Sequence, residues 1–364
     1  MNFFKSLFGS KEETIHSYAD FWKWFEKNEG RFYKVVKNNG DIQHAFFDKI
    51  APKLKQLKEG FWYVAGMFDD DTAELILTAD GITKNIAFVE EMVAAAPNMK
   101  RWKITALKQA SNIAEYKLEM NGYVFGVNTM HFYSNDHSEL PDEIDITITH
   151  QDFNDENKNI IINGVYLTLD NFFGELNTVT TIDNINIINT KDAAQELVPI
   201  EKLKDFLIWR EKEFVEKYKG LRHNTENDSY AGLEATLENG LPLLAVVNTD
   251  VLHWDSKASH PWVVVVELKY DGTNTNGMPD ETTYQLLSEI EEKIMAVLKD
   301  EDGYINIGRQ TANGLREIYF ACIDFRKPSK ILYSIQQKYK NRIQIDFDIY
   351  KDKYWQSFNR FKVN

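Results

Sequence analysis

The alternation of hydrophobic and polar positions is clearest in the last third of the chain. A near-continuous apolar run, Val263–Val266, predicts a buried strand, and two later alternating runs are joined at Asn313-Gly314, a strong hairpin signal. The predicted order is strand, helix, strand, strand, helix and strand, over residues 262–270, 279–297, 304–310, 317–324, 328–335 and 343–349. This β-α-β-β-α-β order is the ferredoxin-like plan.

The first third of the chain repeats the same order of predicted elements. Ser17 can cap an aromatic-rich helix over residues 18–28, which we expect to pack on the domain. The elements that follow are a strand at 31–36, a helix at 41–57, a hairpin of 61–68 and 73–78, a helix at 83–96 and a strand at 101–107. The two copies share a pattern and no long identical string, so the hypothesis of a repeated fold depends on spacing alone.

The region between these two parts is richer in predicted strands. Strands are expected at residues 116–120, 123–133, 144–149, 159–162 and 182–188, and helices at 169–176 and 199–218. The polar segment 219–229 marks the domain boundary. The sequence therefore predicts an α+β protein with antiparallel sheets, built of two ferredoxin-like domains of which the first is enlarged. The domains are 1–219, for which a further division into 15–110 and 111–219 is left open, and 220–364.

The charge distribution narrows the classes of partner. The net charge is −14; residues 221–364 contain 17 basic and 21 acidic residues, and the preceding 220 contain 25 and 35. The acidity is densest between residues 134 and 158. Because nucleic-acid affinity comes largely from Lys and Arg on phosphates, we expect no nucleic-acid partner, whereas a basic protein could bind. The alternative is that the excess carboxylates serve solubility alone.

The cysteine content and the apolar segments suggest a cytoplasmic location. Cys322 is the single cysteine and lies in a predicted strand, so no disulfide framework exists and a buried apolar role is expected. No stretch has the roughly 20 apolar residues of a membrane span. The apolar start, residues 1–9, is too short for a signal peptide; a surface contact with a membrane or a self-packed end remain alternatives.

Few residues suggest a catalytic, metal or ligand-binding site, and no cofactor is expected. His253, Asp255 and His260 lie within eight positions, but they have neither a recognised metal-ligand spacing nor a supporting cysteine. Arg309 and Arg316 flank the predicted hairpin turn and could hold a carboxylate or a phosphate, or pair with a neighbour such as Glu317. His131 with Asp136 and His137, and the acidic turns 69–71 and 300–302, are expected to be satisfied turns. The sequence contains no nucleophile elbow, zinc-protease motif or dinucleotide fingerprint.

Several short motifs in the last third carry a resemblance to a family. They are Pro261-Trp262, the segment 276–280, Gly303-Tyr304, Gly308-Arg309, Thr311, Gly314, Arg316-Glu317 and Tyr319-Phe320. In their order and spacing, residues 241–325 resemble the bacterial domain-of-unknown-function 695 family, although Ala321-Cys322 stands where that family tends to an aromatic residue. The resemblance implies a fold and no activity. Its topology also looks like that of the ribonuclease E inhibitor type B proteins, which act by binding an enzyme.

The sequence therefore favours a non-catalytic protein-binding or regulatory module, similar to an inhibitor or an immunity protein, that offers an acidic surface. The alternative is an enzyme or small-ligand-binding protein with a site near His253, Asp255, His260, Arg309 and Arg316. The oligomeric state cannot be predicted from the sequence.

Overall fold

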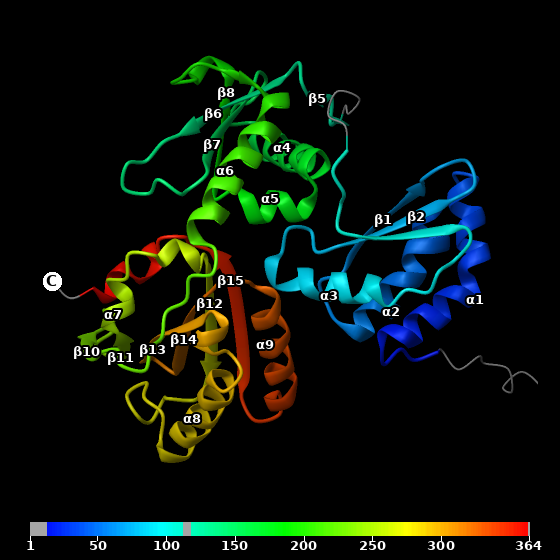
Figure 1. The fold of residues 1–364 in the computed structure, drawn as a ribbon. Helices are drawn as coiled ribbons and strands as arrows, with labels where there is room; N and C mark the ends of the chain where they lie inside the picture. Colours follow the sequence, from blue (N-terminus) through cyan, green and yellow to red (C-terminus); the bar gives the residue numbers. More distant parts are fainter. Residues whose placement is uncertain (1–12, 112–117, 363–364) are drawn as a thin grey trace, which may run out of the picture. The chain divides into compact units, whose positions relative to one another are not determined.

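The computed structural model describes residues 13–111 and 118–362 (Figure 1). The chain divides into two compact units, residues 1–109 and 110–364, and each is described by itself. The expected boundary at 219/220 falls inside the second unit, between a helix and a strand, and stays a prediction.

Unit 1 has a small sheet packed against aromatic helices. Its helices are α1 (Tyr18–Lys37), α2 (Asp48–Leu57) and α3 (Thr83–Ala94), and its strands are β1 (Trp62–Met67), β2 (Ala73–Thr78) and β3 (Trp102–Ala106). The sheet order is β1-β2-β3, with β1 antiparallel and β3 parallel to β2. As predicted, Ser17 caps α1, because its Oγ accepts a hydrogen bond from the Asp20 amide at 3.2 Å.

The strand predicted at residues 31–36 is wrong, because these residues form the second half of α1. Phe25, Phe32 and Val36 are buried at helical spacing and continue the apolar face of the first half. Gly30 is the residue of lowest helix propensity between them, and its cost of about 1 kcal/mol is small beside the burial of these side chains. Unit 1 therefore lacks the opening strand of the predicted β-α-β-β-α-β order.

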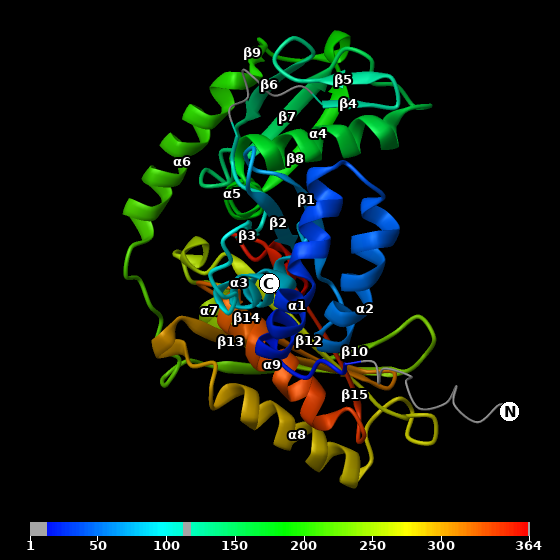
Figure 2. The same ribbon diagram turned by 90° about the vertical axis from the view of Figure 1, so that its right-hand side faces the viewer.

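The first part of unit 2 contains a sheet of order β8-β7-β6-β9, here called the middle sheet. The strands of this part are β4 (Leu118–Met120), β5 (Tyr123–Phe125), β6 (Met130–Asn135), β7 (Asp145–His150), β8 (Asn184–Asn189) and β9 (Val198–Pro199); the helices are α4 (Lys158–Phe173), α5 (Glu175–Thr181) and α6 (Leu203–Tyr218). The strand predicted at 159–162 is wrong, because it is the start of α4, whose buried Ile161, Val165 and Leu169 follow the helical period. Figure 2 shows α6 as a long helix that leads to the connection with β10.

The second part of unit 2 contains the C-terminal sheet, of order β10-β11-β13-β14-β12-β15. Its strands are β10 (Tyr230–Thr236), β11 (Pro242–Asn248), β12 (Trp262–Lys269), β13 (Tyr304–Ala312), β14 (Leu315–Cys322) and β15 (Gln344–Lys351), all paired antiparallel; the helices are α7 (Thr249–Leu252), α8 (Glu281–Met295) and α9 (Arg326–Tyr339). The predicted hairpin is confirmed: β13 pairs with β14 through Asn313-Gly314, whose φ angles of 48° and 75° fit a type I′ turn. The elements from β12 to β15 follow the predicted order.

The two faces of the C-terminal sheet are covered by different elements. One face packs against α8 and α9, with Val266, Ile318 and Leu287 fully buried. The opposite face packs against the C-terminal residues Trp355, Phe358 and Phe361. Beyond β13, the strands β10 and β11 extend the sheet (Figure 1). Leu244 and Val246 of β11 stay exposed, on the face that α8 covers elsewhere.

Gly308 allows the close approach of β11 and β13. Its φ of 140° is a conformation that other residues rarely adopt, and a Cβ there would lie 2.2 Å from the Val246 carbonyl oxygen. The register of the β13–β14 pair shifts between Asn306 and Gly308. In the described residues, no helix is long and apolar enough to cross a membrane.

Candidate functional site

Arg309 and Arg316, two of the predicted site residues, both contact the carboxylate of Glu291 on α8. Arg309 Nη1 lies 2.8 Å from Oε1, and Arg316 Nη1 lies 3.4 Å from Oε2. The side chains of Arg316 and Glu291 are 2% and 8% exposed, whereas that of Arg309 is 32% exposed. Burial lowers the pKa of Arg316, against the effect of Glu291. The group carries one net positive charge, and its contact with Glu291 restrains the partly exposed guanidinium of Arg309.

Several exposed apolar side chains lie on the same side of the C-terminal sheet as Arg309. Val246 is directly opposite Arg309 in the β11–β13 register, and Leu244 is opposite Thr311. The Thr311 hydroxyl oxygen accepts a hydrogen bond from Arg316 Nε. The Tyr284 ring lies over the Arg316 guanidinium, 5.2 Å from its carbon. We call the surface formed by Tyr230, Leu244, Val246, Tyr284 and Arg309 the sheet-end surface. Its four apolar members are 38–51% exposed (Tyr230 51%, Leu244 44%, Val246 38%, Tyr284 45%).

Of the three candidate residues His253, Asp255 and His260, only His260 is buried. The side chain of His260 is fully buried; its Nδ1 lies 2.8 Å from Ser259 Oγ and its ring packs against Trp254. Burial, with the nearby Arg222 and His223, lowers the pKa of His260 to about 3, so the imidazole is neutral at physiological pH. His253 and Asp255 are exposed in the loop before it.

The five predicted site residues do not converge. Arg316 is opposite Leu268 in the register of β12 and β14, whereas His260 lies two residues before Trp262 at the other end of β12. Six residues of strand separate these levels by roughly 20 Å. A cavity of about 540 Å³ is lined by residues 222–226, 300 and 301, and by none of the five.

Most of the remaining polar residues singled out in the sequence satisfy local structure. His131 is the exception, because it lies on β6 and its buried Nδ1 has no hydrogen-bond partner among the described residues, so the expectation of a satisfied turn is wrong there. His137 pairs with Asp145 at 2.8 Å, Asp69 accepts hydrogen bonds from the amides of Asp71 and Thr72, and Asp300 accepts from Thr225. Among the described residues, no group of three His, Cys, Asp or Glu side chains could hold a metal ion. Cys322 is fully buried, as predicted, and burial raises the pKa of its thiol.

The acidic stretch 134–158 does not form one surface. Its exposed carboxylates lie in the loop before β7, at Asp136 and Glu139, and in the loop after it, at Asp152, Asp155 and Glu156. Because the two loops lie at opposite ends of a six-residue strand, roughly 20 Å separates them. This division weakens the hypothesis of a single acidic contact surface in this part of the chain.

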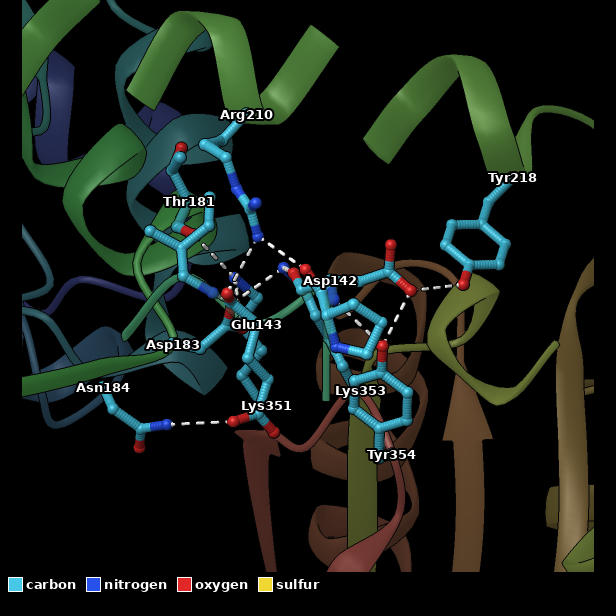
Figure 3. Close-up of polar contacts among 12 residues, drawn as sticks. Asp142, Glu143, Thr181, Asp183, Asn184, Arg210, Tyr218, Lys351, Lys353 and Tyr354 are labelled. Carbon is cyan, nitrogen blue, oxygen red and sulfur yellow. Dashed lines mark hydrogen bonds and ion pairs between the residues drawn. The ribbon is translucent and has the colours of Figure 1, made fainter. Parts of the chain in front are cut away.

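A dense polar cluster joins the two parts of unit 2 (Figure 3). The ammonium groups of Lys351 and Lys353 contact the two oxygens of Asp183, at 2.8 and 2.7 Å, and Lys353 also donates to the Asp142 carbonyl. The Asp142 carboxylate accepts hydrogen bonds from Tyr218 at 2.6 Å and from Tyr354 at 2.7 Å. These contacts bring the end of β15 against loops of the middle sheet. We call this group the lysine cluster.

The pKa values of the lysine cluster reflect its burial. Desolvation, opposed by Asp183, lowers the pKa of Lys351 to about 8, and desolvation together with Asp183 raises the pKa of Glu143. A cavity of about 210 Å³ lies beside these groups. Since both ammonium groups are already matched to carboxylate or carbonyl oxygens, the contacts support a connecting role for this cluster and not a site for a free anion.

Comparisons with known proteins bear on one part of the chain. Residues 235–362 match a family of unknown function (DUF695). This match covers β11 to the C-terminal helical turn, including Glu291, Arg309 and Arg316, and it supports the resemblance seen in the sequence. No curated protein and no solved structure matches the chain.

Sequence reasoning missed the two carboxylates, Glu291 and Asp183, that the arginine and lysine side chains of these groups contact. Glu291 is one of three acidic residues among 289–292, and only its helical position toward the sheet distinguishes it. The pair Lys351 and Lys353 at the end of an alternating strand was a usable signal, because a lysine that points inward needs a carboxylate. Nothing in the sequence shows that Asp183 is that carboxylate.

Proposed function

We propose that this protein is a non-catalytic protein-binding module and that its partner binds at the sheet-end surface. The observation that carries the proposal is the exposure of Leu244 and Val246 on the sheet face that α8 buries elsewhere. Exposed apolar side chains that adjoin one another on a sheet are typical of interaction sites.

The composition and rigidity of the sheet-end surface support the proposal. Tyr and Arg are enriched among the residues that dominate binding energy at interfaces. Arg309 is held by Glu291 at 2.8 Å, and Tyr284 lies over Arg316, so both side chains lose little conformational freedom on binding. The alternative of an enzyme or small-ligand site would require a pocket that unites the five predicted residues, and the register of β12 and β14 separates them.

We also infer a ferredoxin-like arrangement for residues 262–351. Its support is the antiparallel strand order β13-β14-β12-β15, together with the contact of α8 and α9 through Tyr339 and Glu289. The likeness to ribonuclease E inhibitor type B proteins, a bacterial origin and a cytoplasmic location stay predictions.

The proposal can be tested by quantitative capture of partners from a native lysate with the tagged full chain, at low and high salt. Val246→Glu places a charge in the centre of the sheet-end surface and should abolish capture of any specific partner. Val215→Glu is the matched control, because Val215 is 49% exposed on α6, away from this surface. Equal capture by both variants and the unmodified protein would contradict the proposal.

A further inference from the structure

The outer edge of β10 is open to another strand. The Ser229 carbonyl accepts from the Thr249 amide at 2.9 Å, and the Leu237 amide donates to the Leu241 carbonyl at 2.8 Å. Both pairs belong to the β10–β11 register, so the odd-numbered residues of β10 bond inward to β11. The backbone groups of Tyr230, Gly232 and Glu234 therefore point outward, where the described part of the sheet has no further strand.

The two edge strands of the C-terminal sheet differ in how well they are protected against the addition of another strand. β15, at the opposite edge, contains Asp346, Asp348 and Lys351, and its Ile345 carbonyl accepts a hydrogen bond from Gln336 on α9. β10 contains one charged residue, Glu234, and no proline. Charges and covering elements are the usual means of blocking strand addition, so β10 is the edge that can accept a strand.

Gly232 leaves space for a side chain from an added strand. It is directly opposite Val246 and shares the face of the sheet-end surface. A Cβ at Gly232 would meet no atom within 4 Å. An apolar side chain of an added strand could therefore lie over Gly232 and contact Val246, as aromatic residues do beside strand glycines.

The charged residues near β10 indicate which kind of partner this edge would bind. Residues 224–256 contain neither lysine nor arginine, although Arg222 and Lys257 flank them, and they contain six acidic residues. Five of these are exposed, Glu226, Glu234, Glu238, Asp250 and Asp255, whereas the side chain of Asp228 is 9% exposed and pairs with His223 at 2.7 Å. Glu234 is exposed and lies on the same face as Gly232, two positions away. The positive charge of Arg309 is two strands inward and is paired with Glu291. A basic side chain on an added strand would be opposite or diagonal to Glu234, an arrangement that stabilises strand pairs.

We propose that the free edge of β10 binds an extended basic segment of a partner protein, with an apolar side chain over Gly232 and a lysine or arginine beside Glu234. The inference rests on the proposed function and adds the chemistry of the partner. Backbone hydrogen bonds to Tyr230, Gly232 and Glu234 supply affinity, and the two side-chain positions supply specificity.

The test uses a labelled seven-residue peptide in which lysine, phenylalanine and lysine alternate with threonine. This pattern is the same in both strand directions, so the peptide fits whichever direction β10 accepts. Fluorescence anisotropy with the full chain at low ionic strength should show saturable binding. Two peptides are N-methylated on alternate residues, one on lysine and phenylalanine and one on threonine. One of them should lose binding, since it lacks the donors that β-addition needs, and the other should keep it. Absence of saturable binding by the unmodified peptide overturns the inference.

Variants of the full chain test the two side-chain positions. Glu234→Lys should weaken binding by about fivefold or more, and a peptide with glutamate in place of both lysines should then bind the variant better than the unmodified protein. Gly232→Val should weaken binding by about tenfold because it fills the space over Val246. Glu196→Lys, at an exposed acid elsewhere in unit 2, makes the same charge change and should leave binding unchanged.

The outcomes separate the two proposals. If Glu196→Lys weakens binding as much as Glu234→Lys, the peptide responds to net charge and the inference is wrong. If Val246→Glu abolishes capture of a partner that Glu234→Lys and Gly232→Val still bind normally, the sheet-end surface is the binding site but the β10 edge is not. If Val246→Glu has no effect on capture while the peptide binds as described, the proposed function at the sheet-end surface fails and the edge remains a binding site.

Discussion

Lys353 Nζ lies 2.7 Å from Oδ2 of Asp183, which is 170 positions earlier in the chain. The lysine side chain is 1% exposed and the aspartate side chain 7% exposed. Asp183 also contacts Lys351, so its removal leaves two buried ammonium groups without their carboxylate, and Asp183→Asn should lower the free energy of unfolding by about 3 kcal/mol.

A double-mutant cycle distinguishes this effect from a general loss of packing. The combined variant Lys353→Met with Asp183→Asn should be less destabilised than the sum of the single variants, as measured by urea unfolding. Simple additivity would show that the two groups do not interact in solution.

The neutral His260 predicts a pH dependence of stability. Its pKa is about 3 in the folded state, below the usual value near 6.5, so between these values the unfolded chain binds more protons. Stability should therefore fall as the pH falls from about 6.5, by up to about 1.4 kcal/mol per pH unit from this group. His260→Phe should remove this contribution, and the difference between the two unfolding profiles over pH 4–7 measures it. Parallel profiles would contradict the assignment.

Glu291 and Arg309 should differ in their importance for stability although they form one ion pair. Glu291→Gln leaves the buried charge of Arg316 without its carboxylate and should cost about 3 kcal/mol. Arg309→Met removes a side chain that is 32% exposed and should cost less than about 1 kcal/mol. Thermal and urea unfolding of the two variants measure the contrast, and equal losses would show that the buried charge of Arg316 does not depend on Glu291.

Gly308→Ala should destabilise unit 2 more than a surface substitution does. The added Cβ would meet the Val246 carbonyl at 2.2 Å in a backbone conformation that disfavours alanine. We expect a loss of at least about 2 kcal/mol. Gly232→Ala is the control, because its Cβ would meet nothing within 4 Å, and it should change stability by less than about 1 kcal/mol.

The C-terminal sheet could be predicted from the sequence because its signals are local. Val263–Val266 is a buried apolar run, and Asn313-Gly314 specifies a turn that joins two alternating segments. The same reasoning failed at residues 31–36, where aromatic residues suit a strand and a buried helix equally. In the structure Phe32 of the helix packs against Phe46, with 4.6 Å between the ring centroids. That contact is formed by tertiary structure and is absent from any local pattern.

The candidate sites were predictable in part. Arg309 and Arg316 are brought together because they flank one hairpin turn, a relationship that the sequence shows directly. Their shared carboxylate comes from a preceding helix, and its identity depends on how that helix rotates over the sheet. His260 is far from Arg309 in the sequence. It is also far from it in the structure, because the two residues lie at different levels along the paired strands of the sheet.

Lys351 is the last residue of β15, and successive residues of a strand alternate between faces. If β15 paired with β12 one residue out of step, Lys351 would point to the opposite side of the sheet and lose Asp183. The misaligned chain would also turn Ile345, Phe347 and Ile349 away from the helices. The contact with Asp183 thus adds an electrostatic penalty to the hydrophobic one, and the correct alignment of the last strand is favoured by a residue that lies outside its own sheet.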